Sequence, residues 1–280
     1  MKYPNQYSNE LQLLAQVEET MQSLLPDTES TVRDAGYHHL TAGGSRVRAK
    51  LAIQAACALG LDEPASVAIS SATEILHNAS LLHDDLQDSD PIRRGQEAVW
   101  KKFGKNAAIC TGDLFLSAAY AALACCRTER LTELICHMHQ NTEKVISGQQ
   151  ADLEADTYTK KAYEKIARMK SGPLLGLPVE LCLIAAGHST FVPLAQQASY
   201  EIAIAYQVTD DIQDMDKDKV KGALNYTSLL TGSPTEVIDE ARAYASERAK
   251  KAQRAAADLP NGSGFGLNLL AQRFIYANEH

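Results

Sequence analysis

The chain has 280 residues, 45% of them hydrophobic, so it can bury a sizeable core. Its formal net charge of −8 argues against a nucleic-acid-binding protein, which needs a clustered basic face. The N-terminus is polar, and no run reaches the roughly 18 uninterrupted apolar residues of a membrane span. We therefore expect a cytoplasmic protein without a transmembrane segment, folded as one domain over residues 1–280.

Apolar residues three and four positions apart predict helices along the whole chain, and no segment alternates like a strand. The fold class is therefore all-α. The predicted helices cover about residues 8–24, a segment after Thr28, 47–59, 64–88, 107–126 with an interruption at Gly112 and Asp113, 128–153, 163–169, an apolar stretch that leads to Asp214, 234–257 and 265–277. The six cysteines lie in apolar stretches without a Cys-x-x-Cys pair, so we expect reduced thiols in the core.

A glycine turn precedes the third predicted helix. Gly43 and Gly44 are followed by Ser45, Arg46 and Arg48. A helix N-terminus that carries arginines can bind an anion, because free N–H groups, the helix dipole and the side-chain charge act together. A glycine turn with solvated arginines explains the same residues equally well.

Three aspartates lie in the last turns of the helix predicted over 64–88. Asp84, Asp85 and Asp88 are three and four positions apart, so we expect their carboxylates to converge on one face. The neighbouring leucines indicate that the helix is largely buried. Buried carboxylates are costly unless a metal or protons neutralise them.

The same spacing returns at Asp210, Asp211 and Asp214, again after an apolar run. Two such helices facing each other across a bundle would offer only oxygen ligands. This ligand set suits Mg²⁺, which is usually held by a few carboxylates together with substrate phosphates. A diphosphate is therefore the expected ligand.

Several motifs resemble one family of enzymes. The two Asp-Asp-x-x-Asp motifs, Arg93-Arg94-Gly95 after the first and Gln207 before the second are similar to those of trans-isoprenyl diphosphate synthases, the polyprenyl synthetase family. The motifs occur in the family's order over residues 43–214. The resemblance implies a single helical bundle of the isoprenoid synthase type around a deep central cavity, and a homodimer.

The resemblance also implies roles for individual residues. All six aspartates would bind Mg²⁺, with three ions per site. Arg93 and Lys170 would contact the allylic diphosphate, and Arg48, Arg94 and His77 would hold isopentenyl diphosphate. The full set implied in substrate binding is Ser45, Arg48, His77, Arg93, Arg94, Lys170, Ser171 and Gln207.

Two segments depart from the family pattern. Ser45 stands where the family usually has Lys, so isopentenyl diphosphate would bind more weakly or rely on Arg46 or Lys50. After Asp214 the pattern is irregular, and further phosphate-binding lysines could be Lys217, Lys219 or Lys221.

Two other segments are similar to family segments. Residues 148–152 resemble a recurring segment with a structural or supporting role. Ser171 follows Lys170 where the family has Thr, and Pro173 predicts a kink that would aim Lys170 into the cavity.

Product length depends on the helix before the first motif. We expect the growing tail to pass Ser80, Ala79 and Leu76, which are one to two turns before Asp84. The small residues favour C15 to C20 products, with Phe115 as an alternative floor.

The expected activity is Mg²⁺-dependent head-to-tail (1'-4) condensation of isopentenyl diphosphate with an allylic diphosphate. A class I terpene cyclase shares the fold and the ionisation chemistry, but normally replaces the second motif with an Asn/Ser/Glu-type metal site. A non-catalytic subunit of a heteromeric synthase would explain Ser45, but such subunits tend to lose the Asp motifs.

Overall fold

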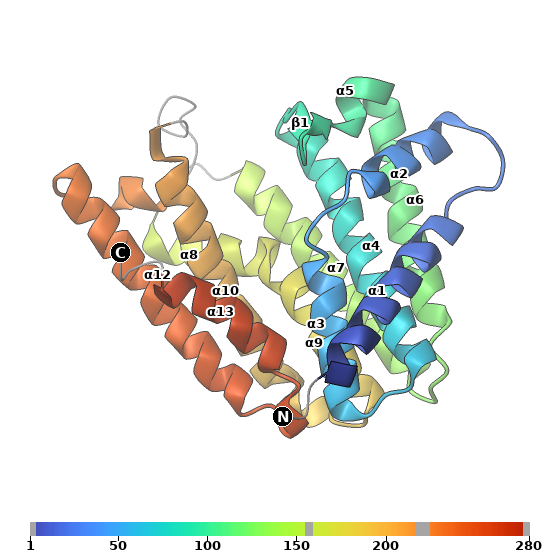
Figure 1. Cartoon of the computed structure of the whole chain (residues 1–280). Helices are drawn as coiled ribbons and strands as arrows, with labels where there is room; N and C mark the ends of the chain where they lie inside the picture. Colours follow the sequence, from blue (N-terminus) through green and yellow to red (C-terminus); the bar gives the residue numbers. More distant parts are fainter. Residues whose placement is uncertain (1–3, 155–158, 217–224, 277–280) are drawn as a thin grey trace. The chain divides into compact units, whose positions relative to one another are not determined.

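The computed structural model describes residues 4–154, 159–216 and 225–276. Helices make up most of this part of the chain, so the predicted all-α class is confirmed (Figure 1). The chain divides into two compact units, with the boundary between Ile135 and Cys136. Each unit has its own set of buried apolar side chains.

Unit 1 is built around one central helix, α4 (Glu63–Gln87), which packs against α1, α3, α5 and α6. Asp62 caps the start of α4 by accepting a hydrogen bond from the backbone N–H of Ala65 at 2.9 Å, and Pro64 stands in the first turn. The remaining elements of the unit are α1 (Pro4–Ser23), α2 (Thr31–Thr41), α3 (Val47–Leu59), β1 (Ile92–Arg93), β2 (Gln96–Glu97), α5 (Val99–Phe103) and α6 (Lys105–Ala124).

α6 runs without a break through Gly112, so the predicted interruption is wrong. A Cβ atom at Gly112 would lie 2.2 Å from Nε2 of His83 on α4. The glycine therefore allows α4 and α6 to approach closely and does not end the helix. By length and composition, α6 could also cross a membrane, but half of its most apolar window (50%) is buried inside the structure. A core helix of a soluble protein meets the same criteria, so this helix carries little weight as a membrane span.

A short hairpin between α4 and α5 was not expected from the sequence. Ile92 pairs with Glu97 and Arg93 with Gln96. Arg94 and Gly95 form the turn, with φ angles of 52° and 77°. Positive φ at both central residues is the geometry of a type I′ hairpin turn. Strands of two residues are too short to give an alternating pattern in the sequence.

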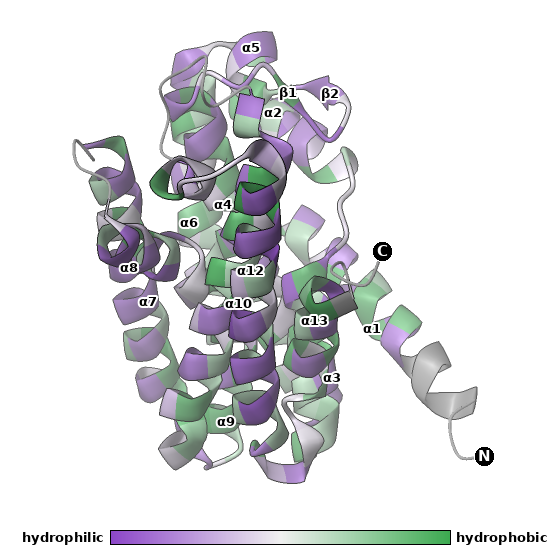
Figure 2. Ribbon diagram, turned by 90° about the vertical axis from the view of Figure 1, so that its left-hand side faces the viewer, coloured by the Kyte–Doolittle hydropathy of each residue, from purple (hydrophilic) through white to green (hydrophobic). Residues whose placement is uncertain are grey.

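Unit 2 has the corresponding arrangement around α10 (Val192–Gln213), which packs against α8, α9, α12 and α13. α12 and α13 run side by side in Figure 1. Hydrophilic and hydrophobic residues share most helices, as Figure 2 shows, so most helices contribute one face to the core, whereas α9 is buried almost throughout. The other elements are α7 (Leu131–Leu153), which begins in the last residues of unit 1, α8 (Lys160–Lys170), α9 (Gly172–Ala185), α12 (Pro234–Ala257), α13 (Phe265–Tyr276) and the 3₁₀ helices η1 (Ser189–Phe191), η2 (Tyr226–Leu229) and η3 (Pro260–Gly262).

All six cysteines are free thiols, but only Cys126 and Cys182 are buried. The expectation that all six lie in the core is wrong for the four exposed ones, Cys57, Cys110, Cys125 and Cys136. An apolar stretch of helix still has an outward face, and a cysteine on that face is exposed.

Candidate active site

The central helix of each unit ends in an Asp motif. Asp88 caps the C-terminus of α4, and its N–H donates to the carbonyl oxygen of Asp84 at 2.8 Å. Asp214 caps α10 in the same way and donates to the carbonyl oxygen of Asp210 at 2.9 Å. Neither helix has a basic residue in its last turn. Carboxylates at the negative end of a helix dipole are unfavourable, so both helix ends favour a bound cation.

The middle aspartate of the first motif is tied to an arginine of the hairpin. Arg93 Nε donates to Asp85 Oδ1 at 2.7 Å, and Arg93 Nη2 donates to the same oxygen. The Asp85 side chain is 2% exposed, and its Oδ2 atom has no hydrogen-bond partner among the described residues. Burial raises the pKa of Asp85, although the hydrogen bonds from Arg93 oppose the shift. Asp85 therefore holds Arg93 and keeps one oxygen unsatisfied.

The middle aspartate of the second motif is held by three protein donors. Asp211 Oδ2 accepts hydrogen bonds from the Tyr163 hydroxyl at 2.8 Å and from the Tyr226 N–H at 2.6 Å. Oδ1 accepts from Gln207 Nε2 at 3.0 Å. Burial, together with the negative charge of Asp211, raises the pKa of Tyr163 far above its ordinary value, so the phenol remains a donor. Asp211 thus organises α8, α10 and η2.

The outer aspartates are more accessible. Asp88 and Asp214 are exposed, and Asp84 and Asp210 are partly exposed. Burial, reinforced by the charge of Asp214, raises the pKa of Asp210. In the described part of the chain, no three His, Cys, Asp or Glu side chains form a ready-made metal site. The middle aspartate of each motif is held by protein donors, and the convergence of the three carboxylates stays a prediction.

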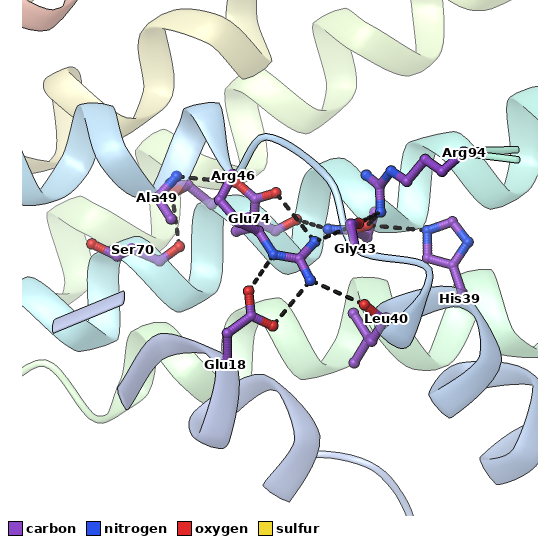
Figure 3. Close-up of polar contacts among 11 residues, drawn as sticks. Glu18, His39, Leu40, Gly43, Arg46, Ala49, Ser70, Glu74 and Arg94 are labelled. Carbon is purple, nitrogen blue, oxygen red and sulfur yellow. Dashed lines mark hydrogen bonds and ion pairs between the residues drawn. The ribbon is translucent and has the colours of Figure 1, made fainter. Parts of the chain in front are cut away.

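Arg46 lies behind the glycine turn and is fully engaged there (Figure 3). It is the N-cap of α3, with a φ of 50°, and its side chain is 9% exposed. The guanidinium binds the Glu18 carboxylate with two nitrogens and also donates to the carbonyl oxygens of Leu40 at 3.0 Å and Gly43 at 3.1 Å. The suggestion that Arg46 replaces the missing lysine at a diphosphate is not supported by this geometry.

A buried glutamate occupies the start of α3. Glu74 on α4 is 1% exposed, and its Oε2 atom accepts a hydrogen bond from the Ala49 N–H at 3.1 Å. Its Oε1 atom lies 3.9 Å from Arg46 Nη1. A protein carboxylate therefore already uses part of the N-terminal charge of α3. The predicted anion site at this helix start is to that extent filled from within.

Arg94 lies on the other side of the glycine turn. Its Nη1 atom donates to the Gly43 carbonyl oxygen and, at 3.3 Å, to Asn78 Oδ1. A Cβ atom on Gly44 would lie 2.8 Å from Arg94 Cζ, and Gly44 has a φ of 135°. Position 44 therefore needs glycine both for its backbone and for the guanidinium against it.

Two histidines, the buried His39 and the partly exposed His77, accompany Arg94. Burial, followed by the charge of Arg94, lowers the pKa of His39 to about 3. His39 Nε2 lies 3.0 Å from Asn78 Oδ1, and the Asn78 amide nitrogen donates to the Glu74 carbonyl oxygen at 2.7 Å. Burial, followed by the charges of Arg48 and Arg94, also lowers the pKa of His77. The charges of Arg48 and Arg94 thus act on His77 within unit 1, and the imidazoles of His39 and His77 are neutral.

Lys170 is the last residue of α8, and Ser171 separates α8 from α9. α9 has Pro173 in its first turn, so the helix is interrupted where the kink was predicted. Lys170 Nζ forms an ion pair with Asp152 Oδ2 at 2.7 Å. A small cavity of about 40 Å³ in unit 2 is lined by Asp152, Tyr163, Ile166, Ala167, Lys170 and Gln207. Lys170 and Gln207 therefore lie at one cavity with the tyrosine that holds Asp211.

The residues predicted to set product length are in the interior of unit 1. Leu76 and Ala79 are each 3% exposed. Ser80 is partly exposed, and its hydroxyl donates to the His77 carbonyl oxygen at 2.8 Å. Phe115 is fully buried, with its ring centroid 5.9 Å from that of His39. The lysines proposed after the second motif, Lys217, Lys219 and Lys221, lie outside the described residues.

The sequence pattern of polyprenyl synthetases matches residues 29–258. The chain belongs to the polyprenyl synthetase family. It is 30% identical over 230 residues to a geranylgeranyl diphosphate synthase of Methanosarcina mazei, covering 79% of this chain and 71% of that protein. It is 32% identical over 197 residues to a farnesyl diphosphate synthase of Geobacillus stearothermophilus, covering 66% of each chain.

Solved structures support the same fold. A geranylgeranyl pyrophosphate synthetase from Pyrococcus horikoshii aligns with a TM-score of 0.84 at 24% identity, covering 98% of this chain and 99% of the other. One from Geoglobus acetivorans aligns with a TM-score of 0.82 at 24% identity, covering 92% and 96%. At this identity, the likeness concerns the fold alone.

Several residues around this polyprenyl synthetase's motifs were not predicted from its sequence. His39, Glu74 and Asn78 gave no signal because none belongs to a recognised motif, and contacts such as His39 with Asn78 join positions 39 residues apart. Tyr163 was treated only as the start of a helix. Unit 2 also has a larger cavity of about 810 Å³, and none of its lining residues was predicted for the site: Lys144, Thr159, Lys161, Ala162, Glu164, Lys165, Arg168, Met169, Pro173 and Tyr200.

The first prediction concerns Arg46. Arg46→Ala removes the partner of the Glu18 carboxylate and the positive charge 3.9 Å from the buried Glu74, so we expect a loss of about 3–5 kcal/mol in the free energy of unfolding. Ser45→Ala, next to it and exposed, should change this quantity by less than about 0.5 kcal/mol. Urea denaturation of both variants measures the difference. Unchanged stability of Arg46→Ala would mean that Arg46 is not a structural residue.

The second prediction concerns pH. The pKa of His39 is lowered in the folded state to about 3, so the unfolded chain takes up a proton as the pH falls from about 6.5 towards 3 while the folded chain does not. The free energy of unfolding is therefore at its full value above about pH 6.5, and it falls on acidification as the unfolded chain binds the proton. His39→Gln should flatten the fall of the melting temperature over this range. An unchanged pH profile would contradict a neutral, buried His39.

Proposed function

We propose that the chain is a prenyltransferase that condenses isopentenyl diphosphate head to tail (1'-4) with an allylic diphosphate and releases a C15 to C20 prenyl diphosphate. One observation carries this proposal. The central helix of each unit ends in an Asp motif and has no basic residue in its last turn. The names of the relatives, geranylgeranyl and farnesyl diphosphate synthases, support the substrate class.

The proposed enzyme uses both units as one isoprenoid synthase domain over residues 1–280. The family match over residues 29–258 includes parts of both units, which supports this arrangement. A homodimer and a cytoplasmic location stay predictions.

The donor set fits Mg²⁺. Asp84 and Asp88 at one helix end, and Asp210 and Asp214 at the other, offer only oxygens, and two carboxylates leave coordination positions for diphosphate oxygens. The Oδ2 atom of buried Asp85, which has no hydrogen-bond partner in the described part of the chain, is a further site of negative charge. We assign three ions per site, as the family resemblance implies. When bound, Mg²⁺ would stabilise the charge that develops on the leaving pyrophosphate.

The allylic diphosphate is held by Arg93 and Lys170 in this proposal. Asp85 fixes the guanidinium of Arg93 through Nε and Nη2. Asp152 fixes the ammonium of Lys170 through an ion pair of 2.7 Å. Positive groups that are already oriented cost little reorganisation when charge develops during C–O cleavage.

The second substrate, isopentenyl diphosphate, is held by Arg48, Arg94 and the neutral His77. Its double bond attacks the allylic cation, and a proton is then lost to the departing pyrophosphate. Leu76 and Ala79 contribute an apolar wall, which keeps water from quenching the cation.

The test is incubation of the purified chain with Mg²⁺, isopentenyl diphosphate and, separately, dimethylallyl, geranyl or farnesyl diphosphate, with products read by mass spectrometry. A regular prenyl diphosphate supports the proposal and gives the chain length. Hydrocarbon formed without isopentenyl diphosphate would indicate a terpene cyclase. No product in any reaction would indicate a subunit of a heteromeric synthase.

Asp84→Ala and Asp210→Ala should each lower turnover at least about 100-fold, because each removes a ligand that offsets charge in the transition state. Neither change should unfold the chain, since both carboxylates are partly exposed. Asp216→Ala, an exposed acidic residue just beyond the second motif, is the matched control and should retain activity. Wild-type rates in either motif variant would refute the metal assignment.

Ser45→Lys should lower the KM for isopentenyl diphosphate by about tenfold, because a hydrogen bond to a charged group contributes about 1.5–3 kcal/mol. Thr41→Lys adds the same charge at an exposed position four residues earlier and should leave this KM unchanged. Steady-state kinetics with each substrate varied in turn separate the effects. Equal KM values for wild type and Ser45→Lys would place the diphosphate elsewhere.

Ser80→Phe should shorten the product, because a large ring would block the path of the growing tail past this small residue. Product lengths from wild type and variant can be compared by mass spectrometry. Thr73→Val, a conservative change about two helical turns earlier on α4, serves as a packing control. An unchanged product would mean that another residue, such as Phe115, forms the floor.

A further inference from the structure

The orientation of the Arg94 side chain depends on contacts with other segments. It projects from a hairpin turn whose strands have two residues each. An arginine side chain carries about 2 kcal/mol of rotamer entropy, so a free guanidinium would lose affinity when it becomes ordered on a ligand. The groups that order Arg94 in advance therefore affect how well it binds an anion.

The hydrogen-bond acceptors of the Arg94 guanidinium are uncharged. Its Nη1 atom donates to the Gly43 carbonyl oxygen and to Asn78 Oδ1 at 3.3 Å. Arg46, by contrast, is bound by the carboxylate of Glu18. A neutral acceptor orients a guanidinium without cancelling its charge, so the positive charge of Arg94 remains available to an anionic ligand.

The Asn78 side chain is itself fixed by two hydrogen bonds. Its amide nitrogen donates to the Glu74 carbonyl oxygen at 2.7 Å, which turns Oδ1 towards His39 and Arg94. His39 Nε2 lies 3.0 Å from this oxygen, so the neutral imidazole carries its proton on Nε2 and donates it. The His39 ring is in turn packed edge-on against the buried ring of Phe115, at 5.9 Å between centroids.

We propose that His39 and Asn78 are positioning residues that hold Arg94 in a charged, ligand-ready orientation for isopentenyl diphosphate. This rests on the proposed function. Asn78 lends one oxygen to both partners, and His39 keeps that oxygen in place. Neither residue touches the reacting atoms, and both lie on helices of the same unit, α2 and α4.

A purely structural role is the rival explanation, because a buried histidine and asparagine can simply satisfy each other. That role would lower stability and weaken both substrates alike. The positioning role predicts a selective effect on isopentenyl diphosphate, since Arg93, assigned to the allylic diphosphate, is held separately by Asp85.

The experiment uses the full chain and measures binding of isopentenyl diphosphate and, separately, geranyl diphosphate by calorimetry. Asn78→Leu and His39→Leu should each weaken isopentenyl diphosphate about tenfold and leave geranyl diphosphate within about threefold. His39→Gln should restore binding, because a glutamine amide nitrogen can occupy the position of Nε2. Ser71→Ala removes another buried polar group of α4, one without a hydrogen-bond partner among the described residues, and should change neither affinity.

Asn78→Asp tests the role of charge and keeps the shape if Asn78→Leu does not fold. The carboxylate would still orient Arg94 but would pair with its charge, so isopentenyl diphosphate should again bind at least about tenfold more weakly. Wild-type affinity in both Asn78 variants, or equal weakening of both substrates, would overturn the positioning role. A wild-type chain that binds no isopentenyl diphosphate would overturn the proposed function and, with it, this inference.

Discussion

The organisation of both units depends on the cost of negative charge at the end of a helix. α4 and α10 are the central helices of their units, and each ends in aspartates where the helix dipole is already negative. The chain reduces this cost by tying one carboxylate of each motif to its own donors, Arg93 for Asp85 and Tyr163 for Asp211. We propose that the outer carboxylates, which are at least partly exposed, bind a cation. The hairpin after α4 brings Arg93 to Asp85, and the 3₁₀ helix η2 brings the N–H of Tyr226 to Asp211.

Around the glycine turn, the chain separates stability from binding. Arg46 and Arg94 both donate to the carbonyl oxygen of Gly43, but Arg46 is enclosed by carboxylates and Arg94 by neutral acceptors. Two guanidinium groups that meet at one carbonyl oxygen repel each other, and burial together with this repulsion lowers the pKa of Arg94. An anion next to Arg94 would relieve the repulsion.

The helices and both Asp motifs could be predicted from the sequence, because helical periodicity and a spacing of three and four residues are local properties. The helix predicted over residues 47–59, for example, has the same bounds as the observed α3, Val47–Leu59. What could not be predicted depends on contacts between distant segments. The sequence predicts a helix interruption at Gly112, but the structure shows His83 packed against this glycine. The sequence also suggests Arg46 as a phosphate ligand, but the structure places it against Glu18 and Glu74.

The contrast between Ser45 and its neighbour Arg46 bears on how this chain can change over evolutionary time. The Ser45 side chain is exposed, whereas Arg46 joins three segments of unit 1. A substitution at position 45 therefore alters the charge offered to a substrate with little risk to folding, while position 46 has almost no freedom. Two adjacent residues of one motif can in this way drift at very different rates, and substrate preference can be tuned without loss of the scaffold.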